Sequence, residues 1–498
     1  MGRPRASLGI CLSLVLVVTA CGGSAPAASV ASSTGTRAAP SASSSGPGLG
    51  ASGLRPSGPA GSTGAGAGGS AGPVTLTVRD HQDLHIQALS SLLPQFEATM
   101  AARGQPVRVV LQTGPTDDVA FVDQLEADDA AGSGPDLTSF PPTYVPPLVA
   151  AGDLLDLTDR LAAWPDWSAH FYPLLRARAV QADGRIYSVP RGANVIQLFY
   201  WPEVLAASGI PTTPPATWDD LIARMVQLRT ATGRPPLLIP SGASWGSGGF
   251  IEGFADLVLG AGGRIYCTAG QTGCPARGGW IVRGPAYTAA FDLYARLVAD
   301  QLLPVQPLLG AEPWTPTKYF SFPAGQLAVT TQGTWGWTFD WGPDGHAPIA
   351  DLTHRVRTWP FPTTDGSAPF VYGAENWMWA ISARTAHPDL AFTLLQWLTT
   401  GAPLAQDIAA VGNLSPRDDI DGIPPYRDVP YLAEGDLLRE GLARSFPTRP
   451  GLDQVGLAAA AATQQILLGR LDGPGAADLF ARTVTNALGA QAVVTLTP

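Results

Sequence analysis

From residue 74 onward, the apolar positions of the chain change repeatedly between a two-residue period and a helical period. Residues 74–78 (VTLTV) and 107–111 (VRVVL) have the β-branched pattern of strands, whereas residues 84–100 carry apolar residues at helical spacing. The same change recurs downstream, with extended segments expected at 135–140, 186–200, 237–240, 327–331 and 377–382 and helices at 121–131, 144–151, 217–230, 250–260, 287–301, 388–399, 452–468 and 476–488. Strands that alternate with helices predict an α/β fold with a largely parallel sheet.

A different pattern occupies the first 20 residues. Arg3 and Arg5 precede an apolar run of 13 residues (8–20), which is the length of the apolar region of a signal peptide. An uncleaved membrane helix is the alternative, which the shortness of the run disfavours. The small residues before Cys21 resemble the lipobox of bacterial lipoproteins, and this resemblance implies an acylated Cys21 that anchors the protein to a membrane.

Residues 22–73 contain almost only Gly, Ser, Ala, Pro and Thr. Such a segment has too few large apolar side chains to form a core, and as a flexible coil it spans roughly 40 Å. We therefore expect residues 21–73 to be a tether between a lipid anchor and a folded region at 74–498. That region has 425 residues, which is more than one hydrophobic core usually supports, so two lobes are expected.

The net charge reduces the range of expected ligands, and the cysteine count predicts a disulfide. The formal net charge of -10 disfavours binding to nucleic acid, which requires clustered cations. Of the 4 cysteines, Cys11 leaves with the signal peptide and Cys21 is taken by lipid, so only Cys267 and Cys274 remain. In an exported protein these two are expected to form a local disulfide, with two buried free thiols as the alternative.

Several short motifs follow one another in a specific order along residues 74–488. They are Leu93-Pro-Gln-Phe-Glu97 with Val107-Arg-Val109, Gly132-Ser-Gly-Pro-Asp136 with Ala151-Gly-Asp-Leu154, the segment from Tyr187 to Trp218-Asp219-Asp220-Leu221, and Phe322-Pro-Ala-Gly325 through Gly333-Thr-Trp335. Their order resembles that of the extracellular solute-binding proteins of family 1, the carbohydrate-binding components of ABC importers. The chain departs from this pattern at Arg79, where many members have Trp, and at 457–462, where some members offer an aromatic ligand contact.

This resemblance implies a two-lobe α/β fold of the type II periplasmic-binding-protein kind, with a ligand cleft between the lobes. Three crossings between the lobes are expected, near 191–197, 370–376 and 421–429. Lobe 1 would combine 74–191 with 376–425, and lobe 2 would combine 195–372 with 430–498. The resemblance further implies a non-catalytic monomer without a cofactor, which captures a sugar or oligosaccharide by lobe closure and delivers it to an ABC permease. Such a protein is expected to be exported and lipid-anchored at the outer face of the cell membrane or in the periplasm.

Sugar recognition requires flat apolar side chains for the ring faces and polar groups for the hydroxyls. Trp335 follows Gly333 at the end of an expected strand, where the family has a stacking aromatic residue. Trp245 lies in a glycine-rich loop after another expected strand and is a comparable candidate. Trp337 lies two residues after Trp335 and would share its face if the strand continued, and the alternative for these two residues is packing in the core. For Trp245, the alternative is that the surrounding glycines only form a turn.

The densest group of polar and aromatic residues lies at the expected second crossing and comprises Tyr372, Glu375, Asn376 and Trp377. Carboxylate and amide groups suit the binding of hydroxyls, and surface exposure is the alternative for them. Further candidates lie at strand ends or at the first crossing, namely Asp80, Phe140, Arg191 and Asn194. Arg191 would favour an anionic ligand, such as a phosphorylated polyol or a glycerophosphodiester, unless it forms a structural ion pair.

Two other chemistries have partial support in the sequence. Gly242-Ala-Ser244-Trp-Gly246 matches the spacing of a hydrolase nucleophile elbow, and an exported serine hydrolase would need a histidine within hydrogen-bond reach of Ser244. Residues 417–428 approximate a calcium loop through Asp419 and Asp421, but Arg417 occupies its first position. We therefore expect a binding protein with no catalytic residue and no metal ligand.

Overall fold

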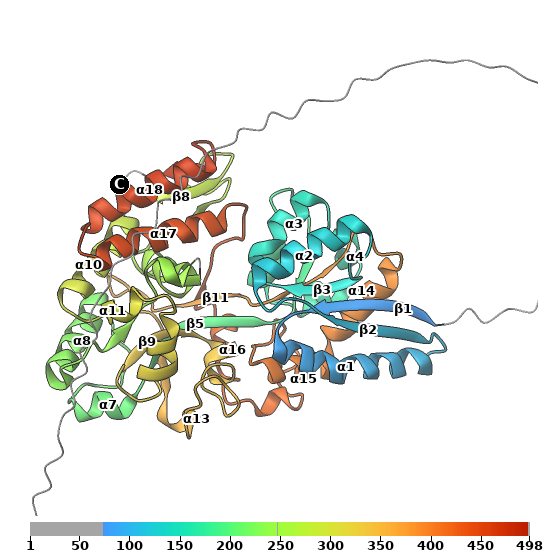
Figure 1. Cartoon of the computed structure of the whole chain (residues 1–498), viewed down its shortest axis with the longest axis horizontal. Helices are drawn as coiled ribbons and strands as arrows, with labels where there is room; N and C mark the ends of the chain where they lie inside the picture. The colour runs from blue at the N-terminus through green and yellow to red at the C-terminus, as the bar shows by residue number, and fades with distance from the viewer. Residues whose placement is uncertain (1–72, 247, 497–498) are drawn as a thin grey trace, which may run out of the picture. The chain divides into compact units, whose positions relative to one another are not determined.

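The computed structural model describes residues 73–246 and 248–496. The expected signal peptide, Cys21 and the tether as far as residue 72 lie outside this part of the chain. Two large β-sheets, each with its own hydrophobic core, are covered by helices (Figure 1), so the two-lobe α/β class expected from the sequence is confirmed. None of the described helices has both the length and the apolarity required to cross a membrane.

The smaller sheet has five strands in the order β2, β1, β3, β12, β4. Their bounds in that order are Val107–Thr113, Val74–Asp80, Leu137–Phe140, Met378–Ile381 and Ser188–Pro190. β1 is parallel to β2 and β3, whereas β12 is antiparallel to β3 and β4. The core of this lobe also contains apolar residues of α1 (Asp83–Ala102), α2 (Asp118–Ala131), α3 (Val145–Ala151) and α14 (Pro388–Leu398).

The larger sheet has the strand order β13, β11, β5, β9, β6, and β10 also pairs with β5. The bounds are Ala443–Arg444, Val371–Glu375, Ala193–Tyr200, Val329–Gly333 and Leu237–Leu238 in that order, with β10 at Arg357–Trp359. β5 is antiparallel to β9, β10 and β11, so the expectation of a largely parallel sheet is wrong here. The larger core includes apolar residues of α8 (Trp218–Thr232), α9 (Ala255–Gly260), α10 (Pro285–Ala299), α17 (Leu452–Leu467) and α18 (Gly473–Leu488).

The chain passes between the two sheets through two very short connections. Residues 191–192 join β4 of the smaller sheet to β5 of the larger one, so the extended segment expected at 186–200 is two strands. Residues 376–377 similarly join β11 to β12. The chain crosses in one direction from β4 to β5 and in the opposite direction from β11 to β12, which is why β5 pairs antiparallel with β11 and β4 pairs antiparallel with β12.

Two helices make the division between the lobes less sharp than the sequence suggested. α6 (Pro173–Ala179) precedes the first crossing, yet its Leu175 belongs to the larger core and the helix contacts β11. α15 (Gly401–Val411) packs along α1, while its Leu404 and Ile408 also belong to the larger core. After α15 the chain continues to α16 (Glu434–Arg439), which contacts β5.

A third, small sheet contains β7 (Tyr266–Cys267), β8 (Gly279–Arg283) and β14 (Val493–Thr495). A disulfide joins Cys267, which is buried, to Cys274 in the loop before β8, with their Cα atoms 5.3 Å apart. The remaining α-helices are short: α4 (Thr158–Ala162), α5 (Pro165–Ala169), α7 (Pro202–Ala207), α11 (Val305–Leu308), α12 (Trp314–Pro316) and α13 (Leu352–Arg355).

Candidate functional site

A cavity of about 700 Å³ is lined by residues from both lobes. This volume is typical of small-molecule sites, which usually measure about 300–1,000 Å³. The smaller lobe contributes the first turn of α2, the short turn η1 (Pro142–Tyr144) with α3, and the crossing at 376–377. The larger lobe contributes β5, β11 and the start of α17, which are labelled in Figure 1, together with the turn η5 (Thr334–Trp337).

Aromatic side chains line this cavity from both lobes. Tyr144 and Trp377 belong to the smaller lobe, whereas Trp335 and Tyr372 belong to the larger one. Trp335 and Trp377 are half-buried, so part of each indole is accessible. Burial raises the pKa of both Tyr144 and Tyr372 to about 12, and both phenols therefore keep their protons at neutral pH. Flat surfaces on two sides can hold the CH face of a sugar ring between them.

A buried ion pair between Arg178 and Glu375 forms one polar wall of the cavity. The Arg178 guanidinium donates two hydrogen bonds to the Glu375 carboxylate, one of them at 3.0 Å from Nη2 to Oε1. Arg178 also donates to the hydroxyls of Ser445 at 2.7 Å and Thr448 at 3.2 Å. Burial lowers the pKa of Arg178, but the adjacent Glu375 carboxylate more than offsets this, so the pKa lies above its ordinary value and the guanidinium is charged.

Amide side chains provide uncharged polar groups near this pair. Asn194 on β5 is 7 % exposed, and its buried Oδ1 atom has no hydrogen-bond partner among the residues that the structure describes. Asn376 donates through Nδ2 to Asn413, and its backbone N–H donates to the Gly192 carbonyl at 3.0 Å. An amide both donates and accepts, as a sugar hydroxyl does, so Asn194 can pair with a ligand hydroxyl.

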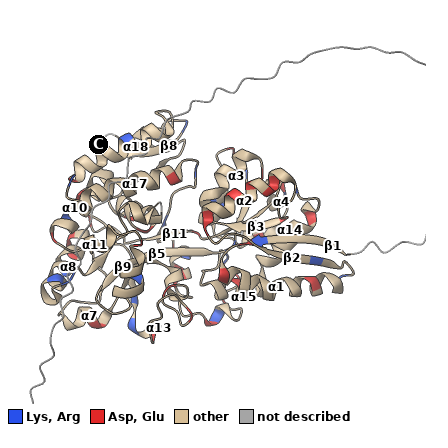
Figure 2. Ribbon diagram, viewed as in Figure 1, with Lys and Arg blue, Asp and Glu red and all other residues tan. Residues whose placement is uncertain are grey.

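Of the predicted ligand contacts, six line this cavity: Asn194, Trp335, Tyr372, Glu375, Asn376 and Trp377. Acidic residues also reach it from both lobes, with Asp118 on α2 and Asp453 on α17 (Figure 2 shows the acidic residues in red). Arg178 is committed to Glu375, and Arg449 donates through Nη1 to the carbonyls of Val180 and Thr448. The cavity therefore offers one arginine that is paired with a carboxylate, a second arginine that donates to backbone carbonyls, and two partly free carboxylates.

Asp80 and Arg191 were predicted to contact the ligand, and the structure contradicts this. Both side chains are completely buried, and Arg191 Nη1 lies 2.7 Å from Asp80 Oδ2. Arg191 also forms two hydrogen bonds with Asp407 on α15, at 2.7 and 2.6 Å. Burial raises the pKa of Asp80, but His85 and Arg191 lower it further than burial raises it, so the carboxylate stays ionised. The group is a structural ion-pair network at the first crossing.

Phe140 and Trp245 were also predicted to contact the ligand, and neither is among the residues that line the cavity. Phe140 is 0 % exposed in the core of the smaller lobe, and all four residues of β3 are buried. Trp245 belongs to the larger core, where it packs edge-on against Trp314 with 6.2 Å between ring centroids. The Lys318 ammonium lies 5.5 Å from the Trp245 ring. Trp337, for which packing in the core was the alternative to ligand contact, is buried.

The structure does not support the hydrolase or the calcium loop. Ser244 lies in a single turn, Ala243–Trp245, and within 73–246 and 248–496 no histidine hydrogen-bonds to it. Arg417 is 1 % exposed and donates to Asp419 at 2.8 and 2.7 Å, while Arg439 donates to Asp421. Both carboxylates of the supposed loop are thus already paired with arginines.

Several residues of the cavity carried no recognisable signal in the sequence. Arg178 is one of two arginines in α6, Thr448 follows a short extended segment, Tyr144 ends the turn η1, and Asp118 begins α2. Arg178 and Glu375 are 197 positions apart, and no local pattern reveals a partner at that distance. The prolines at 141, 142, 146 and 147, which surround Tyr144, were the one available hint.

Comparisons with known proteins agree with this architecture. A family model described as "Bacterial extracellular solute-binding protein" matches residues 94–430. The cyclic alpha-maltosyl-1,6-maltose binding protein from Arthrobacter globiformis has a similar structure, with a TM-score of 0.68 and 21% identity over 84% of this chain and 100% of that chain. The sugar-binding protein MalE from Xanthomonas citri has a TM-score of 0.68 and 18% identity, over 83% and 97% of the two chains. No curated protein sequence matches the chain.

Proposed function

Because the chain belongs to the bacterial extracellular solute-binding proteins, we propose that it captures a sugar or oligosaccharide outside the cell and delivers it to an ABC permease. The observation that carries this proposal is the cavity of about 700 Å³ in which Tyr144, Trp335 and Trp377 accompany the Arg178–Glu375 pair. Aromatic faces suit sugar rings, and buried polar groups suit their hydroxyls. Solved proteins of similar fold were crystallised with maltose and with maltotetraose.

Capture by this mechanism requires closure of the lobes around the ligand. Because the cavity is lined by both lobes, a ligand that contacts both stabilises the closed form by its additional contacts. The chain performs no chemistry on its ligand in this proposal. Delivery then depends on recognition of the closed form by the permease.

An uncharged ligand fits the cavity better than a phosphorylated polyol. Arg191, the residue that would have bound a phosphate, is enclosed by Asp80 and Asp407. Arg178 is likewise committed to Glu375, whereas Asp118 and Asp453 in the cavity would repel an anion.

A thermal-shift screen tests the proposal directly. The panel comprises maltose, maltotetraose, a cyclic tetrasaccharide and ribitol, with glycerol 3-phosphate and glycerophosphocholine as phosphorylated comparators. A ligand present at a hundred times its dissociation constant adds about 2.7 kcal/mol of stability, which is easily measured as a higher melting temperature. We expect a neutral saccharide to produce this shift. Shifts with the phosphorylated compounds alone would contradict the proposal.

The membrane anchor is a separate part of the proposal, and it rests on Cys21 and its resemblance to a lipobox. Cys21→Ser should release the protein into the soluble fraction, because only the tether at 22–73 would remain. Cys11→Ser is the matched control, since this residue lies within the expected signal peptide and should leave the anchor intact. Continued sedimentation of the Cys21 variant with membranes in high salt would contradict lipid anchoring.

A further inference from the structure

The indole of Trp377 in the cavity wall lies beside two buried imidazoles. Its ring centroid is 5.1 Å from that of His81 and 4.6 Å from that of His85, which it meets edge-on. His81 and His85 are 0 % and 6 % exposed, so neither contributes appreciable surface to the cavity. Both histidines therefore act on the cavity only through their neighbours.

His81 also contacts the other acidic wall of the cavity. One face of its ring stacks on Phe121 of α2, with 3.9 Å between centroids and 26° between planes. Its Nε2 atom lies 2.8 Å from Oδ1 of Asp118, which belongs to the first turn of α2 and lines the cavity. One imidazole thus contacts both an aromatic and an acidic residue of the same binding surface.

The hydrogen bonds around His81 determine its tautomer. A carboxylate oxygen only accepts, so the proton must be on Nε2. Nδ1 is buried and has no partner in the described part of the chain, which fits a nitrogen without a proton. The backbone N–H of His81 donates to Asp80 Oδ1 at 2.7 Å, which ties the residue to the ion-pair network of Arg191.

We propose that His81 is a positioning residue for carbohydrate binding, which holds the Asp118 carboxylate and the Trp377 indole in the arrangement that the ligand meets. This inference rests on the proposed function and assigns Asp118 the role of a hydroxyl acceptor. His81 and Gln82 both approach Oδ1 of Asp118, at 2.8 and 3.5 Å. Oδ2 has no hydrogen bond within 73–246 and 248–496, and the side chain is 41 % exposed. This second oxygen is therefore available to a ligand hydroxyl.

A double-mutant cycle separates positioning from a general structural role. His81→Phe retains an aromatic ring against Phe121 and Trp377 but cannot donate to Asp118, and Asp118→Asn removes the carboxylate. Each variant should weaken binding of maltotetraose, or of the panel sugar with the largest thermal shift, by about tenfold, as expected for a hydrogen bond to a charged group. If His81 acts through Asp118, the double variant should also be only about tenfold weaker, because coupled residues are not additive.

Asp117→Asn is the matched control in this experiment. Asp117 precedes Asp118, caps α2 by accepting from the Ala120 N–H at 2.9 Å, and is not among the residues that line the cavity. Asparagine caps a helix about as well, so this variant should bind the sugar with unchanged affinity. Affinities that multiply to about a hundredfold loss in the double variant, or unchanged affinity in His81→Phe, would overturn the proposal.

A measurement without ligand distinguishes failure of this inference from failure of the proposed function. The chain has 6 histidines, so nitrogen-15 NMR of histidine-labelled protein can assign the His81 ring by its loss in His81→Phe. We expect a proton on Nε2 and a bare Nδ1, with a change in the Nε2 resonance in Asp118→Asn but not in Asp117→Asn. The opposite tautomer would overturn the inference even if sugars bind, whereas the expected tautomer without any sugar binding would refute the proposed function and leave only the His81–Asp118 contact established.

Discussion

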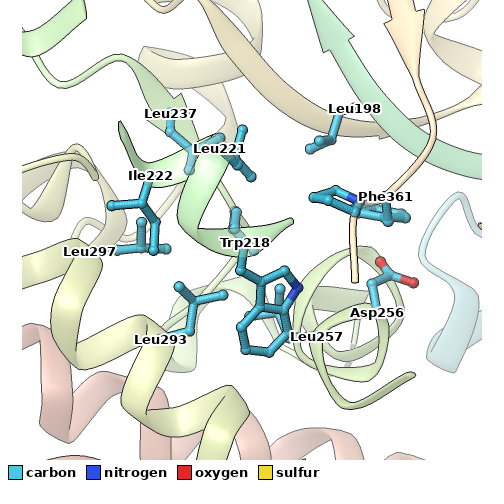
Figure 3. A pocket seen from close by; sticks show the side chains of 12 residues that line it. Leu198, Trp218, Leu221, Ile222, Leu237, Asp256, Leu257, Leu293, Leu297 and Phe361 are labelled. Carbon is cyan, nitrogen blue, oxygen red and sulfur yellow. The ribbon is translucent and has the colours of Figure 1, made fainter. Parts of the chain in front are cut away.

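Two cavities in the described part of the chain each combine tryptophan with a buried carboxylate, and they differ in whether they have the properties of a binding site. The larger one measures about 700 Å³ and holds Glu375 against Arg178. The smaller one measures about 20 Å³ and is lined by Trp218, Phe361, several leucines and Asp256 (Figure 3). Residue types alone would not separate them, since both have an aromatic ring beside an acid.

The difference lies in what surrounds each carboxylate. Glu375 accepts from Arg178 and from the Thr448 hydroxyl, so its charge is compensated. Asp256 is 1 % exposed, and neither of its oxygens has a partner among the described residues. Burial, followed by the nearby Glu252, raises the pKa of Asp256 well above its ordinary value, which favours the uncharged form of this carboxyl group. A polar site requires both compensated charge and space, and the smaller cavity has neither.

Breaking the ion pair of the larger cavity should have the largest effect. Arg178→Met leaves Glu375 buried without a cation and should lower the free energy of unfolding by about 3–5 kcal/mol, measured by urea denaturation. Adding Glu375→Gln in the same chain should restore part of this loss.

A surface ion pair provides the control for Arg178→Met. Arg296 pairs with Asp219 at 2.6 Å, but both side chains are at least half exposed, at 50 % and 83 %. Arg296→Met should therefore change stability by less than about 1 kcal/mol. Equal losses in the two arginine variants would mean that burial does not distinguish the two pairs.

The next largest effect should be on affinity. Trp335→Ala removes one aromatic wall of the larger cavity, and truncation of such an anchor usually costs at least about 2 kcal/mol of binding, or roughly thirtyfold in dissociation constant. Isothermal calorimetry with the sugar identified in the thermal-shift screen measures this change. The fold should be retained.

Trp337→Phe is the control for Trp335→Ala because the two tryptophans are two residues apart but have different roles. Trp337 is buried and donates from Nε1 to Oε1 of Glu434 at 2.7 Å. Its substitution should reduce stability without changing sugar affinity. If Trp335→Ala bound the sugar normally, Trp335 would be a structural residue like Trp337.

The architecture could be predicted from the sequence because it depends on the local spacing of apolar residues and on the order of short motifs along the chain. The crossings at 191–192 and 376–377 fall within or next to the predicted ranges, and the cavity residues Asn194 and Tyr372 lie on the strands beside them. Strand ends that meet at a crossing border the space between the lobes, and Asn194 and Tyr372 are among the residues that line it. For these two residues, position in the fold was therefore sufficient to predict that they line the cavity.

The partners of charged residues could not be predicted in the same way. Arg191 looked like an anion-binding residue because its two carboxylates, Asp80 and Asp407, lie 111 and 216 positions away in the chain. His81 and Arg178 were missed for the same reason, since their contacts also involve distant segments. Charge pairing depends on tertiary contacts, whereas alternation of strands and helices depends on neighbours in sequence.

A substitution in the smaller cavity should have a smaller effect on the free energy of unfolding than Arg178→Met, and of the opposite sign. Asp256→Leu replaces a buried carboxyl without partners by an apolar side chain in apolar surroundings, and should raise the free energy of unfolding at pH 7 by about 1–3 kcal/mol. A loss of stability instead would mean that the Asp256 carboxyl makes a favourable interaction in the core.

The pH dependence provides a second test of Asp256. The folded state binds its proton more tightly than the unfolded state, so the stability associated with this group is fully present below about pH 4 and is lost as pH rises toward the folded pKa. Burial also raises the pKa of Glu434 to about 7. This group therefore also lowers the free energy of unfolding as pH rises, and it does so equally in the wild type and in Asp256→Leu. The difference between wild type and Asp256→Leu should therefore grow with pH, and a constant difference would contradict the assignment.

The smallest expected effect sharpens the comparison at the level of single hydroxyl groups. Thr448 lies 3.2 Å from Arg178 Nη2 and 3.3 Å from Glu375 Oε1, so Thr448→Val removes hydrogen bonds to a charged pair and should cost about 1.5 kcal/mol of stability. Thr331 on β9 is completely buried, but its hydroxyl has no partner in the part of the chain that the structure describes. Thr331→Val makes the same change of atoms without losing a hydrogen bond, and should be neutral or slightly stabilising.

Urea denaturation of both variants measures the difference in stability. Sugar affinity should fall only in Thr448→Val, because Thr448 lines the cavity and Thr331 does not. Equal effects in the two valine variants would show that the polar groups around Glu375 contribute no more than an unpaired hydroxyl in the core.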